Sequence, residues 1–375
     1  MRGLLIALGF PVQYRVLRCA AKAGMSVSVL GNAEAKQLRF SRYCNSFELV
    51  PPHLENSPGT QLDAWADLLI GLIEKQGADI LLPGDAQATL LLGQLRSRLE
   101  MRSNVRIFPV PTESAFLELN DKWAFYKNCL RLNLPVPKTW RFDSKEDAIR
   151  ALATEEFPDR LVVKPLDLWG GYGVKLFDRK DAGFGIRGLD YEPLLIQEYI
   201  EGEDTGLSVL VRSGRIVASL IHQVRSRRFY FFHCEEFLRI GEALATDYNC
   251  DGILHIDAQM TPSGELYLLE CNPRVYLSMD YAALAGINLI ELGIRDSIPA
   301  DAPPLTVGEI TFRKPPELIK SVLKFKGFER NDLRAAAFQI ADPVMFALET
   351  WRLVFKERTE VWLQARPTAL EPAKN

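Results

Sequence analysis

The chain has 375 residues, which exceeds one average hydrophobic core and predicts two or three domains. Its formal net charge of −3 gives no electrostatic basis for nucleic acid as the main partner. No apolar run is long enough to span a bilayer, so we expect no transmembrane segment. The six cysteines lack the spacing of a disulfide framework or a zinc site, which predicts a reducing, cytoplasmic location.

The amino-terminal part of the chain has the pattern of an α/β domain. Residues 3–8 predict a strand, residues 12–23 a helix and residues 26–30 a second strand. This β-α-β order indicates a Rossmann-like domain, which we place at residues 1–110. Gly9-Phe10-Pro11 stands in place of a glycine fingerprint, so an NAD-dependent oxidoreductase is disfavoured.

Residues 61–76 predict a helix, residues 79–82 a strand and residues 86–100 another helix. Asp85 lies where this strand ends, so it could touch a substrate. It could equally begin the helix as its N-cap, which is the interpretation we favour.

Residues 114–132 predict a helical stretch that contains Asn120-Asp121-Lys122. The prolines within residues 134–139 predict a stiff extended linker. We place a small lid after this linker, at residues 139–200.

Residues 161–165 predict a buried strand that ends near Lys164, followed by a glycine loop at residues 170–173. A lysine beside such a loop can hold phosphates, although a short glycine-rich turn alone is common in hairpins. Residues 194–204 predict an apolar strand that runs into an acidic turn. This turn could meet an adenine edge and a ribose, or it could be a solvated acidic loop.

Two strands, near residues 206–212 and 215–222, are predicted to join at Ser213-Gly214. Residues 222–228 then concentrate positive charge before a run of aromatic residues. A solvated basic turn and a grip on a carboxylate or phosphate explain this segment equally well, and Arg225 is the leading substrate contact in the second case.

Residues 253–274 contain two apolar runs with an acid in each, joined by turn residues Thr261–Gly264, which predicts an antiparallel hairpin. If Met260 pairs with Glu265, one face of this hairpin carries His255, Asp257, Gln259, Glu270 and Asn272. Two carboxylates and an amide oxygen on one face suit Mg²⁺, with Arg274 projecting beside it. A polar sheet face that is simply wetted by solvent is the alternative.

Helices are also predicted over residues 235–248 and 281–294. After the prolines near residue 303 the composition shifts, and residues 303–375 are expected to form a small α/β segment. Its strand is predicted near residues 308–313 and an amphipathic helix at residues 342–363. Core packing or an oligomer contact, such as a homodimer, is favoured for this helix over membrane anchoring.

The order of these motifs resembles the ATP-grasp superfamily, and the resemblance covers roughly residues 1 to 300. The matching pieces are Asn120-Asp121-Lys122, Val163-Lys164-Pro165, the loop 170–173, Gln197-Glu198-Tyr199-Ile200, Asp257, and Glu270-Cys271-Asn272-Pro273-Arg274. The resemblance implies an α/β protein with a Rossmann-like amino-terminal domain, a two-lobed ATP-grasp domain at residues 111–302 and the small carboxyl-terminal segment.

The resemblance also implies ATP and Mg²⁺ as cofactors, for which Mn²⁺ could substitute. The positions that match phosphate-binding lysines and the closing loop are Lys122, Lys164, Gly170, Gly171 and Gly173. The adenine hinge corresponds to Gln197, Glu198 and Ile200, and the ribose acid to Asp204, with Glu203 as a competitor. The metal ligands correspond to Asp257, Glu270 and Asn272, and the arginine that steadies an acyl phosphate corresponds to Arg274.

By the same resemblance, the expected activity is that of a carboxylate–amine ligase, which joins a small carboxylate to an amine and releases ADP and phosphate. Lys164, Arg274 and Arg225 are the expected catalytic residues. Peptide-forming relatives carry an arginine two residues before the first metal acid, where this chain has His255. The Asn-Pro-Arg ending is closer to carbamoyl phosphate synthetase and biotin carboxylase, so a bicarbonate-activating enzyme is an alternative. An ATP-binding sensor without catalysis is another.

Overall fold

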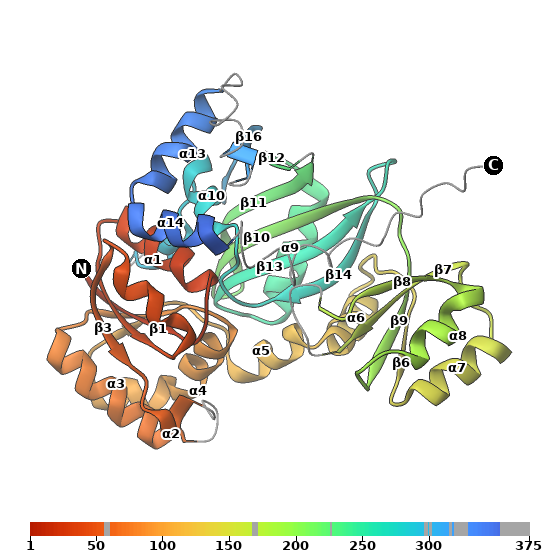
Figure 1. The fold of residues 1–375 in the computed structure, drawn as a ribbon, viewed down its shortest axis with the longest axis horizontal. Coiled ribbons are helices and arrows are strands. Elements are labelled where there is room, and N and C mark those ends of the chain that lie inside the picture. The colour runs from red at the N-terminus through yellow and green to blue at the C-terminus, as the bar shows by residue number, and fades with distance from the viewer. Residues whose placement is uncertain are drawn as a thin grey trace. The chain divides into compact units, whose positions relative to one another are not determined.

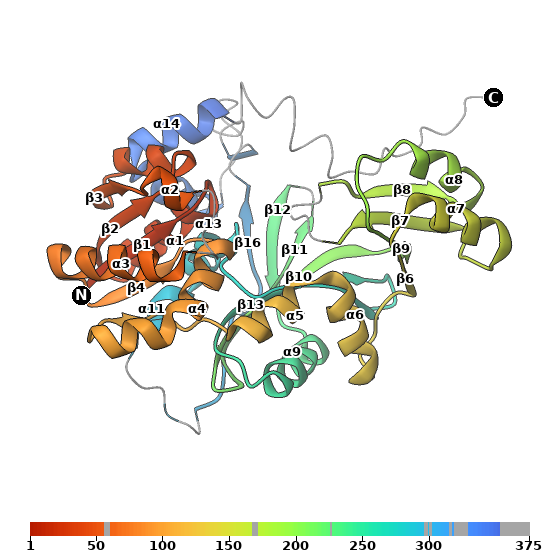
Figure 2. The same cartoon turned by 90° about the horizontal axis from the view of Figure 1, so that it is seen from below.

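The computed structural model describes residues 1–55, 61–166, 172–225, 227–295, 299, 302–314, 317–318 and 329–352. They form two compact units, whose elements are labelled in Figures 1 and 2. Among the described residues, the first unit comprises Met1–Leu119, Asp204–Asp257 and Cys271–Leu348, and the second comprises Asn120–Glu203, Ala258–Glu270 and residues 349–352. Among the described helices, none is long and apolar enough to cross a membrane.

A parallel sheet with the order β3-β2-β1-β4-β5 confirms the predicted Rossmann-like topology in the first unit. Its strands are β1 Arg2–Ala7, β2 Ser26–Gly31, β3 Cys44–Leu49, β4 Ile80–Pro83 and β5 Arg106–Ile107. The accompanying helices are α1 Val12–Lys22, η1 Glu34–Phe40, α2 Pro52–Glu55, α3 Leu62–Gln76, α4 Ala86–Arg102 and α5 Glu113–Asn120.

Strand β1 is apolar from Gly3 to Ala7 because helices cover both faces of the sheet. Leu5 and Ala7 share a hydrophobic cluster with Leu17 of α1. Leu4 and Ile6, which point the other way, share a second cluster with residues of α3 and α4.

An antiparallel sheet follows, with the strand order β14-β13-β10-β11-β12-β16, and the short strand β15 pairs with β11. The strands are β10 Glu203–Arg212, β11 Arg215–Arg225, β12 Arg228–Phe232, β13 Gly252–Met260, β14 Leu266–Asn272, β15 Leu305–Thr306 and β16 Ile310–Arg313. Ser213 and Gly214 have φ of 48° and 72°, as a tight hairpin turn requires, which confirms that predicted junction. Helix α9 Glu235–Asp247 packs on this sheet.

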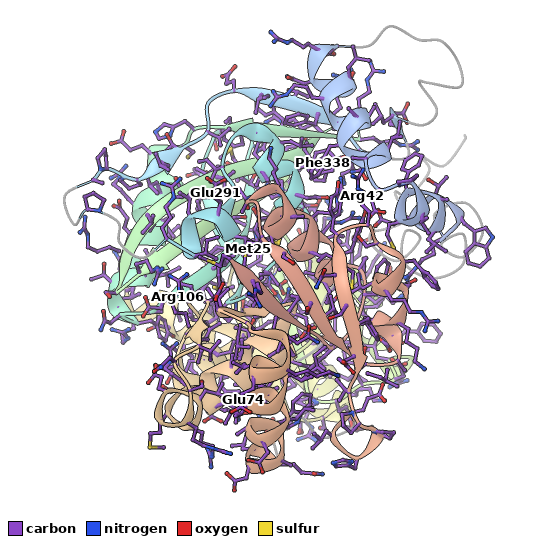
Figure 3. The ribbon with its side chains drawn as sticks, turned by 90° about the vertical axis from the view of Figure 1, so that its left-hand side faces the viewer. Met25, Arg42, Glu74, Arg106, Glu291 and Phe338 are labelled. Carbon is purple, nitrogen blue, oxygen red and sulfur yellow. The ribbon has the colours of Figure 1, made fainter. Side chains whose placement is uncertain are left out.

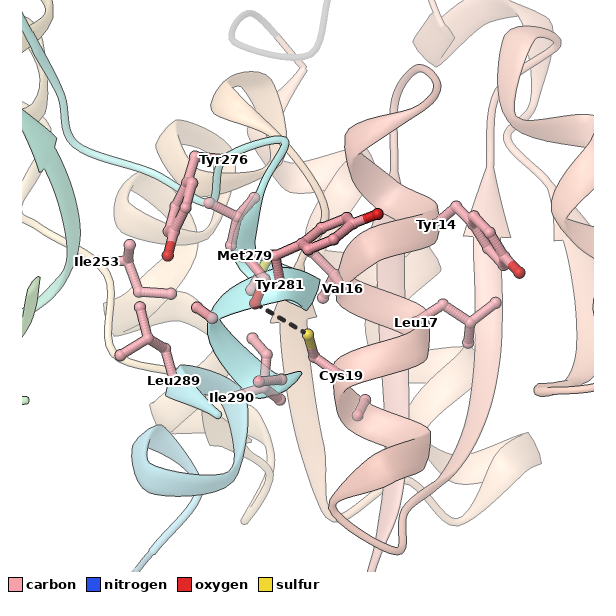
Figure 4. Packing of buried hydrophobic residues seen from close by; sticks show 14 of the residues in the cluster. Tyr14, Val16, Leu17, Cys19, Ile253, Tyr276, Met279, Tyr281, Leu289 and Ile290 are labelled. Carbon is pink, nitrogen blue, oxygen red and sulfur yellow. Dashed lines mark hydrogen bonds between the residues drawn. The ribbon is translucent and has the colours of Figure 1, made fainter. Parts of the chain in front are cut away.

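The helix predicted at residues 281–294 is two helices, α10 Met279–Ala285 and α11 Leu289–Gly293. Gly286 has φ of 117° and Asn288 caps α11, so the chain reverses between them. Figure 4 shows α10 and α11 packed against α1, where the Cys19 thiol faces the Met279 carbonyl at 3.8 Å.

The carboxyl-terminal segment packs on the same unit through α13 Arg330–Ile340, which the sequence did not predict, and α14 Pro343–Trp351. Arg42 donates to the Ala341 carbonyl at 2.9 Å, close to Phe338 in Figure 3. Helix α14 falls within the helix predicted at residues 342–363, of which residues 353–363 lie outside the described residues. Its Met345 is fully buried, consistent with core packing.

The second unit contains a four-stranded sheet with the order β6-β9-β7-β8. The strands are β6 Thr139–Phe142, β7 Arg160–Pro165, β8 Lys175–Asp178 and β9 Leu194–Glu198, and the helices are α6 Lys122–Arg131, α7 Lys145–Thr154 and α8 Arg179–Arg187. Leu161 and Val163 of β7 lie in the core with residues of α7 and α8. Lys164 alternates with them along β7 and points to the opposite face.

Candidate active site

Lys122 occupies the first turn of α6 in the second unit. The stretch predicted as one helix over residues 114–132 breaks here, because Asp121 accepts a hydrogen bond from the Ala124 N–H and caps α6. The Lys122 side chain is only 9% exposed, and its Nζ lies 3.3 Å from Glu270 Oε2. It also donates to the Leu166 carbonyl at 3.5 Å. The cation is therefore held inside the unit beside a carboxylate.

Lys164 is the second buried lysine of this unit, with 6% of its surface exposed. Its Nζ donates to Gln197 Oε1 at 2.9 Å and to the Leu269 carbonyl at 3.4 Å. Gln197 is oriented in turn, because its Nε2 donates to Thr139 Oγ1 at 2.8 Å. The Gln197 side chain therefore positions Lys164.

The backbone N–H groups at the end of β9 and just after it are only partly used in hydrogen bonds within the protein. The Glu198 N–H donates to the Lys138 carbonyl at 2.8 Å, and the Tyr199 N–H donates to the Arg160 carbonyl at 3.1 Å. The Arg160 guanidinium also lies over the Tyr199 ring, at 4.0 Å. The Ile200 N–H makes no hydrogen bond within the part of the chain that the structure describes. A ligand with an acceptor edge could use this N–H.

Of the predicted glycine loop, Gly170 and Gly171 lie outside the described residues. Gly173 has φ of 74°, and its carbonyl accepts a hydrogen bond from the Tyr191 hydroxyl at 2.6 Å. A Cβ at this position would lie 3.0 Å from the Tyr191 ring and 3.1 Å from Pro165. Both the backbone angle and the close contacts therefore require glycine.

Glu203 of the second unit and Asp204 of the first unit begin β10, and both are exposed. Burial lowers the pKa of Lys314, and the charge of Asp204 acts to raise it again. Lys314 belongs to the carboxyl-terminal segment, and its Nζ lies 5.0 Å from the centre of the Phe229 ring.

Asp257, Asn272 and Arg274 form a hydrogen-bonded chain in the first unit. Asn272 Nδ2 donates to Asp257 Oδ2 at 3.0 Å, and Arg274 Nη2 donates to Asn272 Oδ1 at 2.8 Å. Burial acts to raise the pKa of Asp257, but the charge and hydrogen bond of His255 outweigh it and hold that pKa below its ordinary value. The carboxylate is therefore ionised at neutral pH.

Glu270 and Asn272 alternate along β14, so both side chains leave the strand on one face. Cys271 between them is buried on the other face of the strand. Among the described residues, no group of three or more His, Cys, Asp and Glu could hold a metal alone. Asp257, Glu270 and Asn272 each carry an oxygen of the kind that Mg²⁺ prefers, and their role as metal ligands stays a prediction.

The predicted basic turn at residues 222–228 is mostly strand, because β11 extends to Arg225 and β12 begins at Arg228. His222 adds no positive charge, since burial and the neighbouring His255 lower its pKa to about 3. The exposed Arg225 lies over the Tyr230 ring at 5.4 Å. Arg228 pairs with Glu329 at 2.7 Å.

Asp85 is the N-cap of α4, as we favoured. Its carboxylate accepts hydrogen bonds from the Ala88 N–H at 2.8 Å, the Leu8 N–H at 2.7 Å and Gln13 Nε2 at 2.7 Å. The residue therefore joins α4 to the end of β1.

A family model described as ATP-grasp in the biosynthetic pathway with Ter operon matches residues 190–310. N5-carboxyaminoimidazole synthetase from Staphylococcus aureus, solved with ADP, is 15% identical over 82% of this chain and 79% of that chain, with a TM-score of 0.60. The L-amino acid ligase from Bacillus licheniformis is 17% identical over 78% of this chain and 73% of that chain, with a TM-score of 0.56.

The biotin carboxylase domain of 2-oxoglutarate carboxylase from Hydrogenobacter thermophilus is 15% identical over 78% of this chain and 68% of that chain, with a TM-score of 0.57. That structure is a dimer in complex with MgADP and bicarbonate. These structures share the fold of this chain over the matched residues, and the family model covers the hairpin that carries Asp257 and Glu270. The family match over residues 190–310 and the shared fold support the resemblance to the ATP-grasp superfamily that the order of the sequence motifs indicated.

Proposed function

We propose that this protein is an ATP-dependent ligase that activates a small carboxylate as an acyl phosphate and joins it to an amine. The observation that supports this best is the pair of lysines buried in the second unit, Lys122 and Lys164. A buried ammonium is unfavourable unless an anion or several hydrogen bonds compensate it. Lys164 donates to Gln197 and to the Leu269 carbonyl, and a nucleotide phosphate bound beside it would add negative charge.

In this proposal the adenine is held by the backbone after Glu198, where the Ile200 N–H would donate to a ring nitrogen. Asp204 would accept hydrogen bonds from the ribose, with Glu203 as the alternative. Gly173 and the glycines before it would let the backbone approach the phosphates. Lys122 and Lys164 would contact the phosphates themselves.

Asp257, Glu270 and Asn272 would hold Mg²⁺, for which Mn²⁺ could substitute. The bound metal would neutralise charge on the outer phosphates of ATP. Asn272 is already oriented for this role, since Asp257 and Arg274 bind the two ends of its amide. Arg274 would in addition offset charge on the acyl phosphate.

The reaction would proceed in two transfers. A carboxylate oxygen of the substrate attacks the γ-phosphorus, the bond to the bridging oxygen breaks, and ADP leaves. The amine nitrogen then attacks the acyl carbon, loses a proton and expels phosphate. Arg225, from the exposed end of β11, could bind the substrate carboxylate in this scheme.

Calorimetry should show that the protein binds Mg·ATP in preference to NAD and that binding weakens without Mg²⁺. Lys164→Met should reduce this affinity more than Lys175→Met, which changes an exposed lysine in the adjacent strand β8. Incubation with ATP, hydroxylamine and a panel of amino acids and metabolites should yield a hydroxamate together with ADP and phosphate. Stoichiometric AMP and pyrophosphate would refute acyl phosphate chemistry, and tight NAD binding without ATP binding would refute the nucleotide site.

A second candidate uses bicarbonate as the activated acid. The Asn-Pro-Arg ending of the hairpin favours it, because this ending is closer to bicarbonate-activating relatives. ATP hydrolysis that rises with added bicarbonate, and with no other acid of the panel, would favour this candidate. Mg·ATP binding without turnover on any acid would instead indicate a nucleotide sensor.

A further inference from the structure

We propose that His255 is a positioning residue that fixes the carboxylate of Asp257, and that Ser208 and Tyr276 hold it in place. This inference rests on the proposed function, in which Asp257 binds the divalent cation. His255 Nε2 lies 3.3 Å from Asp257 Oδ1, and His255 Nδ1 lies 2.8 Å from Ser208 Oγ. A serine, a histidine and an aspartate thus form one line across β10 and β13 of the first unit.

Packing contacts hold the imidazole ring of His255 in addition to its hydrogen bonds. Its ring stacks on Tyr276 with centroids 4.6 Å apart and an angle of 3° between the planes. Tyr276 itself is hydrogen-bonded to Ser208. On the β10 side, a Cβ added at Gly206 would lie 2.9 Å from His255 Cε1, so only glycine leaves room for this ring position.

The hydrogen bonds of His255 with Ser208 and with Asp257 can form whether the imidazole ring is neutral or protonated. An ionised carboxylate only accepts, so Nε2 of His255 carries a hydrogen in both states. A neutral ring then accepts at Nδ1 from the Ser208 hydroxyl, and a protonated ring donates to the same oxygen. The orientation of His255 therefore does not depend on its protonation.

Both oxygens of Asp257 are engaged, which sets the plane of its carboxylate. Oδ1 faces His255 Nε2, and Oδ2 accepts from Asn272 Nδ2 at 3.0 Å. The Asp257 side chain is 38% exposed, so these two donors limit the rotation of its carboxylate. Each oxygen retains a lone pair for a cation. Removal of a group that orients a metal ligand in this way typically lowers the affinity for the metal 10- to 100-fold.

The same contacts argue against an anion-binding role for His255. Both ring nitrogens are occupied by protein groups, and the side chain is only 13% exposed. Position 255 therefore provides no cation for an acyl phosphate, unlike an arginine at the same place. In this chain that task would fall to Arg274 and the two lysines.

The test compares two substitutions that separate the two ring nitrogens. The amide nitrogen of glutamine can take the place of Nε2, whereas asparagine reaches only as far as Nδ1. His255→Asn should therefore weaken Mg²⁺-dependent ATP binding about tenfold, and His255→Gln should stay within about threefold of the wild type. Ser208→Ala, which removes the partner of Nδ1, should shift the Mg²⁺ dependence in the same direction as His255→Asn.

The readout is calorimetry of ATP binding over a series of Mg²⁺ concentrations, with thermal unfolding measured in parallel. ATP binding in the absence of metal should be unchanged in all variants, and the exposed His53→Asn serves as control. Equal Mg²⁺ dependence in the two His255 variants, or an equal loss of metal-free ATP binding, would overturn the positioning role. If His255→Asn does not fold, Ser208→Ala decides, and wild-type Mg²⁺ dependence there refutes the proposal. Absence of Mg·ATP binding in the wild-type protein would refute the proposed function instead.

Discussion

His222 should make the stability of the protein fall steeply below neutral pH. It is buried in β11, where its ring lies 5.7 Å from Phe231, 5.9 Å from Phe229 and 5.9 Å from His255. Burial, followed by the charge of His255, lowers its pKa to about 3, although the charge of Asp257 opposes this. The folded protein therefore keeps His222 neutral between about pH 6.5 and pH 3, where the unfolded chain protonates it.

The direction of this pH dependence follows from the numbers of protons that the folded and unfolded states bind. Between pH 6.5 and pH 3 the unfolded chain binds one more proton at this position, so the free energy of unfolding falls as the pH falls. The stabilisation is complete above a pH of about 6.5, the ordinary value for histidine, and is lost below it. At pH 5 the loss from this residue is about 2 kcal/mol, since each pKa unit corresponds to about 1.4 kcal/mol.

The assay is urea unfolding at pH 8 and pH 5 for the wild-type protein, His222→Gln and the control His53→Gln. Wild type and control should lose about 2 kcal/mol more than His222→Gln between the two pH values, because glutamine does not titrate. Apart from His53, which the control lacks, the other titrating groups are common to the three proteins and cancel in the comparison. An equal loss in all three would show that His222 is protonated in the folded protein and would refute the reasoning.

Three further predictions concern single positions. Asp85→Ala should lower the free energy of unfolding by about 2–3 kcal/mol, because it leaves two backbone N–H groups without their acceptor; Asp85→Asn, which keeps an oxygen, should cost less in the same urea titration. Gly173→Ala should weaken ATP binding in calorimetry because of its positive φ, whereas Gly183→Ala, which meets only one atom at 3.8 Å, should not. Glu270→Ala and Asn272→Ala should abolish turnover without lowering the thermal midpoint by more than a few degrees; wild-type turnover in either variant would mean that the hairpin is only a polar sheet face.

The sequence predicted those elements whose pattern is local. The β-α-β opening, the Ser213–Gly214 turn and the hairpin of β13 and β14 follow from short periodicities and turn residues. The prediction of one helix over residues 281–294 was wrong at its centre. Gly286 is typical of a residue that ends a helix, and Asn288 is typical of a residue that caps the start of the next one. Helix α13 was missed because no strong apolar stripe marks it.

The candidate site was less accessible to the sequence, because its contacts join residues far apart in the chain. Lys164 and Gln197 are separated by 33 residues, and Ser208 and His255 by 47. No periodicity connects such pairs, so Gln197 was assigned only to the adenine hinge and Ser208 was not singled out. Asp257, Glu270 and Asn272 were recognisable because they lie in a single hairpin, and its alternation alone places acids and amide on one face.

The carboxyl-terminal segment lies outside the ATP-grasp resemblance, yet buried polar contacts join it to the first unit. Arg18 of α1 is 1% exposed and donates to Asp280 at 3.1 Å and to Gln339 of α13 at 2.9 Å, with Phe338 stacked 3.8 Å from its guanidinium. Tyr14 donates to the buried Asp342 at 3.2 Å. Such buried charges add little net stability, but removing one partner typically costs about 3–5 kcal/mol. They therefore act to specify where α13 docks, and the segment is part of the core around α1.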